Sequence, residues 1–307
     1  MKRQTAENVK TQDARGRVLF FDIIRILCVA VIIYDHSRFW LVPEFNQFFF
    51  PDGYGPFNIY PAGLQGYAVF GLIFVSGAVI EYTYRGLQKG ESYLTFMKKR
   101  IFRIYPVFWM SLITMLLLFP GLLEDGIGNV LFEFTGFFIV LGQGPGAINP
   151  VGWFVGAIIL LYFLYPWFST VIRKYGLPAL CGFWIMSWSL RYSIITYNLV
   201  PLDLFWRWFP LCNAFEFCLG IYLVQAAIYP KTGNRSPVVR NLADISYPAF
   251  LFHMVVVFAF LNYIPEPGSL PVAIAFYFVM IGSVIPVSEI VLMTDKRIQR
   301  VLAAKFP

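Results

Sequence analysis

The sequence predicts an all-α membrane protein, a polytopic bundle of about eight to ten transmembrane helices with one short or re-entrant segment. Of its 307 residues, 58% are hydrophobic and only 13% are charged, and the mean hydropathy is +0.65. This composition lies far from that of a soluble domain. Apolar runs near the length of about 20 helical residues that crosses a bilayer recur at 18–40, 62–84, 104–122, 151–172, 178–198, 204–228, 244–263 and 270–292.

The remaining segments complete this organisation. The stretch 129–143 is short and is interrupted by Glu133 and Gly136, so we expect it to line the bundle rather than cross the bilayer. Residues 1–17 form a basic tail, and residues 18–307 are predicted to form one membrane domain. The first apolar run contains charged residues and no small-residue cleavage site, which favours a retained helix over a signal peptide.

The positions of the basic residues predict the orientation of the chain. Short cytoplasmic loops collect Lys and Arg, and with the N-terminus inside, the eight spans place most of the 24 basic residues on one side. We therefore expect a multi-pass protein of the cell membrane with both termini in the cytosol. The net charge of +7 belongs to these loops and to anionic lipid headgroups, so no nucleic-acid partner is predicted. The four cysteines form no CxxC pair, which argues against a disulfide framework and a metal site.

Arg25 and His36 are the most informative residues of the first span. They lie eleven residues apart, and this spacing returns both side chains to one helix face. Ionisable residues in hydrocarbon face the bundle interior or a wet cavity, and they commonly mark a functional site. The chain has only two histidines, His36 and His253, and both fall in expected spans, where a neutral imidazole can act as a base. An interfacial, water-bonded role for His36 is the alternative.

Two further patterns accompany this pair. Asp22 precedes Arg25 by three residues and could neutralise it, whereas Asp35, being adjacent to His36, does not face it. At the inner membrane face, Arg100 and Arg103 lie three residues apart, and guanidinium groups bind phosphate oxygens well. The alternative for this second pair is an anchor that follows the positive-inside rule.

These segments together resemble the acyltransferase 3 family of integral-membrane acyltransferases. The matching features are Asp22, Arg25 and His36 in the first span, GYAVFGLIFVSGAVI (66–80), Arg100 and Arg103 before IYP, Trp153 with Tyr162 and Pro166, FEFCLGIYL (215–223), and ISYPAFLFH ending at His253. The resemblance extends over nearly all of residues 18–292.

The resemblance implies the chemistry. Members move an acyl group, usually acetyl, from cytosolic acyl-CoA to a hydroxyl of a carbohydrate or a lipid-linked acceptor. His36 is then the expected base, and Arg25, Arg100 and Arg103 are expected to position the donor. Ser76, Tyr247, Ser246 and His253 are candidates for further donor contacts, although hydroxyls of this kind more often serve helix packing in a bilayer. No metal is expected.

One departure from the family pattern concerns a carboxylate. Many members carry a glutamate five residues after the tryptophan of the Trp153 helix, and here that position is Ile158. Asp35, Glu81 and Glu216 are the substitutes, and Glu216 is the strongest because it lies inside a span. Solvation of a buried arginine, for instance Arg207, explains Glu216 about equally well.

Two other functions fit the composition. A transporter or flippase would also place charged residues and Pro-interrupted or Gly-rich helices in a bundle, and a noncatalytic membrane partner protein would explain the missing carboxylate. The segment 41–63, rich in Pro, Gly and aromatic residues, is expected outside the membrane, either as a landing surface for the acceptor or as part of an interfacial aromatic belt.

Overall fold

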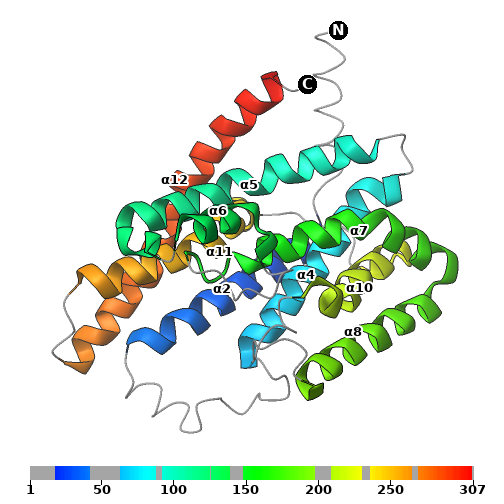
Figure 1. The fold of residues 1–307 in the computed structure, drawn as a ribbon, viewed down its shortest axis with the longest axis horizontal. Helices are drawn as coiled ribbons and strands as arrows, with labels where there is room; N and C mark the ends of the chain where they lie inside the picture. The colour runs from blue at the N-terminus through cyan, green and yellow to red at the C-terminus, as the bar shows by residue number, and fades with distance from the viewer. Residues whose placement is uncertain are drawn as a thin grey trace.

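The computed structural model describes residues 18–41, 63–87, 92–124, 126–138, 148–197, 209–229, 236–264 and 269–305. Within these ranges the chain is helical and contains no strand (Figure 1). The α-helices are α2 (Leu19–Leu41), α4 (Gly63–Tyr84), α5 (Tyr93–Leu118), α6 (Ile127–Thr135), α7 (Trp153–Tyr175), α8 (Leu177–Tyr197), α10 (Ala214–Gln225), α11 (Pro237–Tyr263) and α12 (Leu270–Lys305). Single 3₁₀ turns, η1 (Arg85–Leu87), η2 (Pro120–Leu123) and η4 (Pro210–Asn213), connect them. The expected N-terminal tail and most of the expected outer segment 41–63 lie outside the described residues.

The all-helical membrane architecture that the sequence predicts is confirmed. Five of the described helices are long and apolar enough to cross a bilayer: α4, α5, α7, α11 and α12. With 23 residues α2 is also long enough, but Asp22, Arg25, Asp35 and Arg38 interrupt its apolar run. The structure describes residues 129–138 of the segment 129–143, and residues 129–135 belong to the nine-residue α6, which ends at Gly136 with φ 74°.

Two differences from the expected spans have simple causes. Helices α5, α11 and α12 extend past the apolar runs into charged sequence, because side chains such as those of Lys98, Lys99 and Arg100 favour helix although hydropathy excludes them. Ser92 and Ser236 are the N-caps of α5 and α11, which begin before the expected apolar runs. Conversely, the run 204–228 is described from residue 209 on, where it contains the turn η4 and the 12-residue α10, a helix shorter than a bilayer requires.

Helices α2 and α4 form an antiparallel pair at the centre of the bundle. Gln65 at the start of α4 contacts His36 near the end of α2. At the opposite end, the ring of Tyr229 packs against both Phe21 of α2 and Tyr82 of α4. α11 lies against α2 and α12 and also contacts α5. The start of α2, the end of α4 and the start of α5 therefore lie on the same side of the molecule, which we call the basic end because it carries Lys98, Lys99, Arg100 and Arg103.

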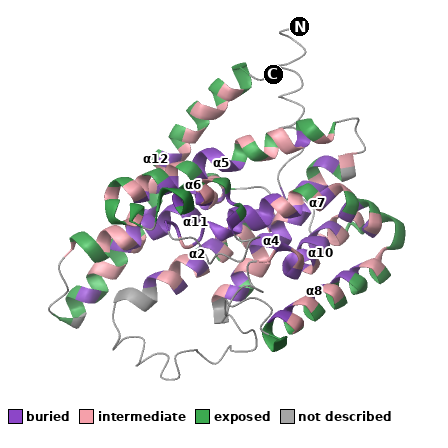
Figure 2. Cartoon of the chain, in the orientation of Figure 1, coloured by how far each residue is buried: buried purple, intermediate pink, exposed green. Residues whose placement is uncertain are grey.

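Burial divides the bundle into an interior and a lipid-facing surface. Buried side chains concentrate in α4, α7, α10 and α11, whereas α8 and the far half of α12 are largely exposed (Figure 2). The exposed residues include large apolar side chains such as Trp184, Trp188 and Val301, which are suited to lipid rather than water. Figure 1 shows the C-terminal end of α12 projecting beyond the other helices.

Glycines allow α4 and α10 to pack in backbone contact. A Cβ atom at Gly77 would overlap the carbonyl of Phe217, and one at Gly220 would overlap the carbonyl of Phe74. Small residues at such crossings let membrane helices approach closely and gain van der Waals contacts. This crossing fixes α4, and hence Gln65, relative to the rest of the bundle.

We expect Gly77→Ala to lower the free energy of unfolding by about 1–3 kcal/mol, because the added methyl group forces two backbones apart. Thermal unfolding of the purified protein in detergent, followed by helical circular dichroism, measures the change. Gly282→Ala is the matched control, since a Cβ atom there meets nothing within 4 Å. Equal melting temperatures for the two variants would contradict the close approach.

Candidate active site

The two histidines, 217 residues apart in the sequence, are in direct contact inside the bundle. His36 Nδ1 lies 2.8 Å from His253 Nε2, and the two ring planes are within 6° of each other. His253 is fully buried in α11, while His36 is partly buried near the end of α2. The antiparallel packing of α2 on α4 and the contact of α2 with α11 produce this arrangement.

Flanking contacts set the direction of this hydrogen-bond chain. His253 Nδ1 lies 3.3 Å from the carbonyl oxygen of Ala249, which can only accept, so Nδ1 of the neutral ring carries the proton. His253 Nε2 then accepts from His36 Nδ1–H. This leaves the lone pair of His36 on Nε2, where the amide nitrogen of Gln65 lies 2.5 Å away and donates to it. The chain runs Gln65, His36, His253, Ala249.

Arg25 lies at the other end of the same helix. Eleven residues correspond to about 16 Å along a helix axis, so Arg25 is close to the basic end while His36 is deep in the bundle. Asp22 pairs with Arg25 at 3.9 Å, as the spacing of three residues predicts, and the carboxylate is almost fully buried. Arg25 itself is partly exposed, with 24% of its side chain accessible.

Arg100 and Arg103 are turned toward different neighbours. Arg100 donates to the Tyr84 hydroxyl at 2.5 Å and its guanidinium lies over the Tyr84 ring. The Nε of Arg100 is buried and has no hydrogen-bond partner among the described residues. Arg103 is exposed and interacts electrostatically with Asp295 of α12. The structure therefore brings Arg100 and Tyr84 together, and Arg103 and Asp295.

Glu216 lies in a buried ion pair apart from the histidines. Its Oε1 is 2.5 Å from Nη2 of Arg191 on α8, and both side chains are almost fully buried. Arg191 also donates to Asn213, at 3.4 Å, and lies over the Trp188 ring. The second carboxylate oxygen of Glu216 has no hydrogen-bond partner in the described part of the chain. Arg191 is thus the buried arginine beside Glu216, and Arg207 lies outside the described residues.

Glu81 occupies a second buried polar cluster between α4, α7 and α10. It accepts hydrogen bonds from Tyr165 at 2.8 Å, Ser169 at 2.7 Å, Arg173 at 2.9 Å and Gln225 at 3.0 Å. Such complete satisfaction is what makes a buried carboxylate tolerable. The arrangement is that of a structural tie between three helices.

The other candidates make mainly local contacts. The hydroxyl of Ser76 donates to Leu72 O and that of Ser246 to Ala243 O, each within its own helix. Tyr247 donates to Ile104 O and thereby ties α11 to α5. Asp35 is buried in α2. Ile158 is also buried and belongs to the apolar core. An apolar core side chain therefore stands where many family members carry a glutamate.

A family model described as an acyltransferase domain, Acyl_transf_3, matches residues 18–231, well over half of the chain. The chain belongs to the acyltransferase 3 family. No curated protein and no solved structure matches it. The matched range contains Arg25, His36, Arg100 and Arg103, whereas α11 and α12, and with them His253, lie beyond it.

Sequence reasoning missed two features of this acyltransferase. Gln65 was not identified because a single glutamine at a helix start carries no pattern. Glu133 accepts the backbone N–H groups of Ile148 and Asn149, both at 2.9 Å, and the Asn149 amide donates to Leu251 O at 3.1 Å, two residues before His253. The position of Glu133 inside an interrupted apolar run was the available signal for this tie.

Metal ligation has no visible basis in the described part of this acyltransferase. The described ranges contain no group of three or more His, Cys, Asp or Glu side chains that could hold a metal ion. Among the ionisable groups that do come together are the histidine pair, the Asp22–Arg25 pair, Arg103 with Asp295, and the two buried glutamates with their arginines.

Proposed function

We propose that this membrane acyltransferase moves an acyl group, acetyl in the first instance, from cytosolic acyl-CoA to a hydroxyl of a carbohydrate or lipid-linked acceptor. The observation that carries the proposal is the hydrogen-bond chain from His36 to His253 and Ala249. This chain leaves the lone pair of His36 Nε2 as a hydrogen-bond acceptor inside the bundle. The buried carboxylates of Glu216, Glu81 and Asp22 are instead paired with arginines. General-base catalysis needs such a group within hydrogen-bond reach of the proton it removes.

In the proposed reaction His36 Nε2 removes the proton of the acceptor hydroxyl, which takes the place of the Gln65 amide. The alkoxide oxygen attacks the thioester carbonyl carbon, the C–S bond breaks, and the CoA thiolate leaves and takes the proton from His36. His253, through its Nε2, holds His36 in the tautomer that makes this possible and is a positioning residue. In a covalent route His36 Nε2 would itself accept the acyl group, and burst kinetics distinguish the two routes.

The donor phosphates are proposed to bind at the basic end, which we place on the cytosolic side together with both termini. Arg100 supports this, because its buried Nε has no partner among the described residues and a phosphate oxygen would supply one. Arg103 and Arg25 lie on the same side, each beside a carboxylate, Asp295 and Asp22 respectively. The separation of about 16 Å between Arg25 and His36 then matches a donor that extends from the basic end toward the histidine pair.

The test is acyl transfer from radiolabelled acetyl-CoA by the purified protein in liposomes, with surface glycans and lipids of the producing cell as acceptors. Labelled acceptor, or thioester hydrolysis in its absence, is the expected result. Movement of the acceptor across the bilayer without cleavage of the thioester would instead indicate a transporter. Absence of both activities with every acceptor fraction would indicate a noncatalytic partner protein.

We expect Arg100→Gln to raise the KM for acyl-CoA about tenfold or more with little change in kcat, because a charge-assisted contact to phosphate is lost from binding and not from the transition state. Steady-state kinetics over a range of donor concentrations separate the two constants. Arg240→Gln, an exposed arginine at the start of α11, is the matched control. An unchanged KM for the Arg100 variant would remove this residue from the donor site.

A further inference from the structure

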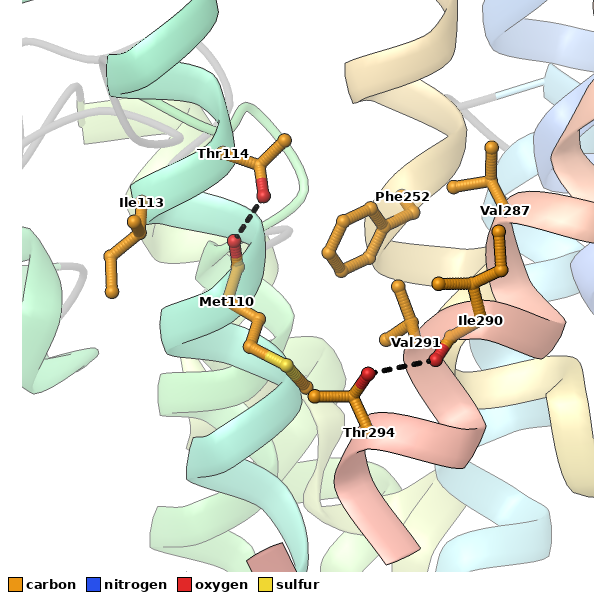
Figure 3. Close-up of a pocket in the computed structure, with 8 residues that line it drawn as sticks. All are labelled: Met110, Ile113, Thr114, Phe252, Val287, Ile290, Val291 and Thr294. Carbon is orange, nitrogen blue, oxygen red and sulfur yellow. Dashed lines mark hydrogen bonds between the residues drawn. The ribbon is translucent and has the colours of Figure 1, made fainter. Parts of the chain in front are cut away.

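A lateral groove lies between α5 and α12, with α11 at its back. Its volume is 340 Å³, and it is lined by Met110 and Ile113 of α5, Phe252 of α11, and Val287, Ile290 and Val291 of α12. Figure 3 shows the α5 side chains on one side and those of α11 and α12 on the other. α5, α11 and α12 are among the candidate membrane spans. The groove therefore lies at the depth of lipid hydrocarbon.

The lining side chains have no unsatisfied hydrogen-bonding group for a polar ligand. Its two hydroxyls, on Thr114 and Thr294, donate to the carbonyls of Met110 and Ile290 in their own helices at 2.7 and 3.0 Å (Figure 3). Every other lining side chain is apolar. Only a hydrocarbon chain matches this surface, because a polar group placed here would lose its hydrogen bonds to water.

The groove opens outward and not toward the histidine pair. Ile113 is 47% exposed and Ile290 is 61% exposed, on the surface that faces lipid. Phe252 forms the back of the groove, whereas the next residue, His253, is turned toward α2 and bonds His36. Adjacent residues of a helix point in directions about 100° apart, so the body of α11 separates the groove from the histidines.

Arginines continue both walls of the groove toward the basic end, and Asp295 of α12 interacts with Arg103 there. Arg297 follows Ile290 by seven residues on α12, and Arg103 precedes Met110 by seven residues on α5. A spacing of seven returns a side chain to nearly the same helix face. The two helices are held together there, because the Gln299 amide donates to Phe102 O. Arg297 is exposed and lies about 10 Å along the axis from Ile290.

We propose that this groove binds an anionic phospholipid of the surrounding bilayer, with one acyl chain between α5 and α12 and the phosphate against Arg297. The apolar lining and the basic end together match the two parts of such a lipid, and the outward opening gives it direct entry from the bilayer. The inference does not depend on the proposed acyl transfer, because it concerns a surface outside the histidine site and is tested by binding alone.

The experiment uses the full-length protein released from nanodiscs of mixed phosphatidylglycerol and phosphatidylcholine, with retained lipids counted by native mass spectrometry. We expect wild type to retain one phosphatidylglycerol in preference to phosphatidylcholine. Ile290→Trp, which fills the groove, should abolish this retention. Ile285→Trp should not, since Ile285 is also exposed on α12 but does not line the groove.

A second variant tests the headgroup contact without altering the groove. Arg297→Gln should reduce the preference for phosphatidylglycerol about fivefold, the size expected for one basic residue near an anionic headgroup, and Lys174→Gln, at the end of α7, should leave it unchanged. Equal retention of the two lipids by wild type, or unaltered retention in Ile290→Trp, would overturn the proposal. Displacement of the retained lipid by palmitoyl-CoA would assign the groove to an acyl donor and would overturn it as well.

Discussion

Replacing His36 with alanine is expected to lower the rate of acyl transfer by about 10²–10⁴-fold, the contribution typical of a positioned general base. The physical reason is that His36 Nε2 is the lone-pair end of the hydrogen-bond chain that begins at Ala249 and His253, whereas His253, the second histidine of the sequence, is fully buried and already bonded to His36. Transfer from radiolabelled acetyl-CoA at saturating donor measures the effect on kcat.

The matched control is Ser283→Ala, whose hydroxyl bonds only the Met280 carbonyl of its own helix. A cycle with His253→Ala tests the orienting role: because His253 acts through His36, the double variant should be no slower than His36→Ala alone. Turnover in His36→Ala equal to that of wild type, in protein that melts at the wild-type temperature, would rule out His36 as the base.

Substituting Glu216 with glutamine is expected to lower the free energy of unfolding by about 3–5 kcal/mol, because it leaves the buried guanidinium of Arg191 without its counter-charge. Both side chains are almost fully buried, and their contact of 2.5 Å is direct. Thermal or denaturant unfolding in detergent, monitored by helical circular dichroism, measures the loss. Glu124→Gln, an exposed carboxylate, should change the free energy by less than about 0.5 kcal/mol.

A double replacement separates charge pairing from catalysis at Glu216. Glu216→Leu combined with Arg191→Met removes both charges and should restore most of the stability, since apolar replacements of a buried pair are often neutral or stabilising. If this stable double variant keeps its acyl-transfer rate, Glu216 is a structural residue. A single Glu216→Gln variant that melts as wild type but has lost turnover would assign Glu216 a catalytic role instead.

The sequence predicted the features that depend on local spacing and on composition. Hydropathy located the apolar cores of most helices, and the spacing of three residues predicted the Asp22–Arg25 pair that the structure contains. Helix boundaries were less accurate, because the charged first turns of α5 and the last turns of α12 are helical without being apolar. For α10, composition alone did not indicate that the helix begins at Ala214, after the 3₁₀ turn η4, and ends at Gln225.

Contacts between distant segments could not be predicted in the same way. Arg191 and Glu216 lie on different helices, and nothing in either segment specifies that they pair. Nor does either segment specify that Gln65 contacts His36, or that Glu133 accepts the backbone N–H of Ile148. Each contact depends on how helices cross, and the crossing of α4 with α10 in turn depends on the close fit at Gly77 and Gly220.

The sequence by itself determined that this protein is a helical membrane protein, that it resembles the acyltransferase 3 family, and that Arg25 and His36 share one helix face. The resemblance rests on short sequence motifs, and the other two conclusions follow from composition, periodicity and the cost of charge in hydrocarbon, all of which are local properties. Only the tertiary structure decided that His253 contacts His36, that Arg191 pairs with Glu216, and that an apolar groove lies between α5 and α12. The reason is that side-chain partners across a bundle are set by the packing of whole helices, which no single segment encodes.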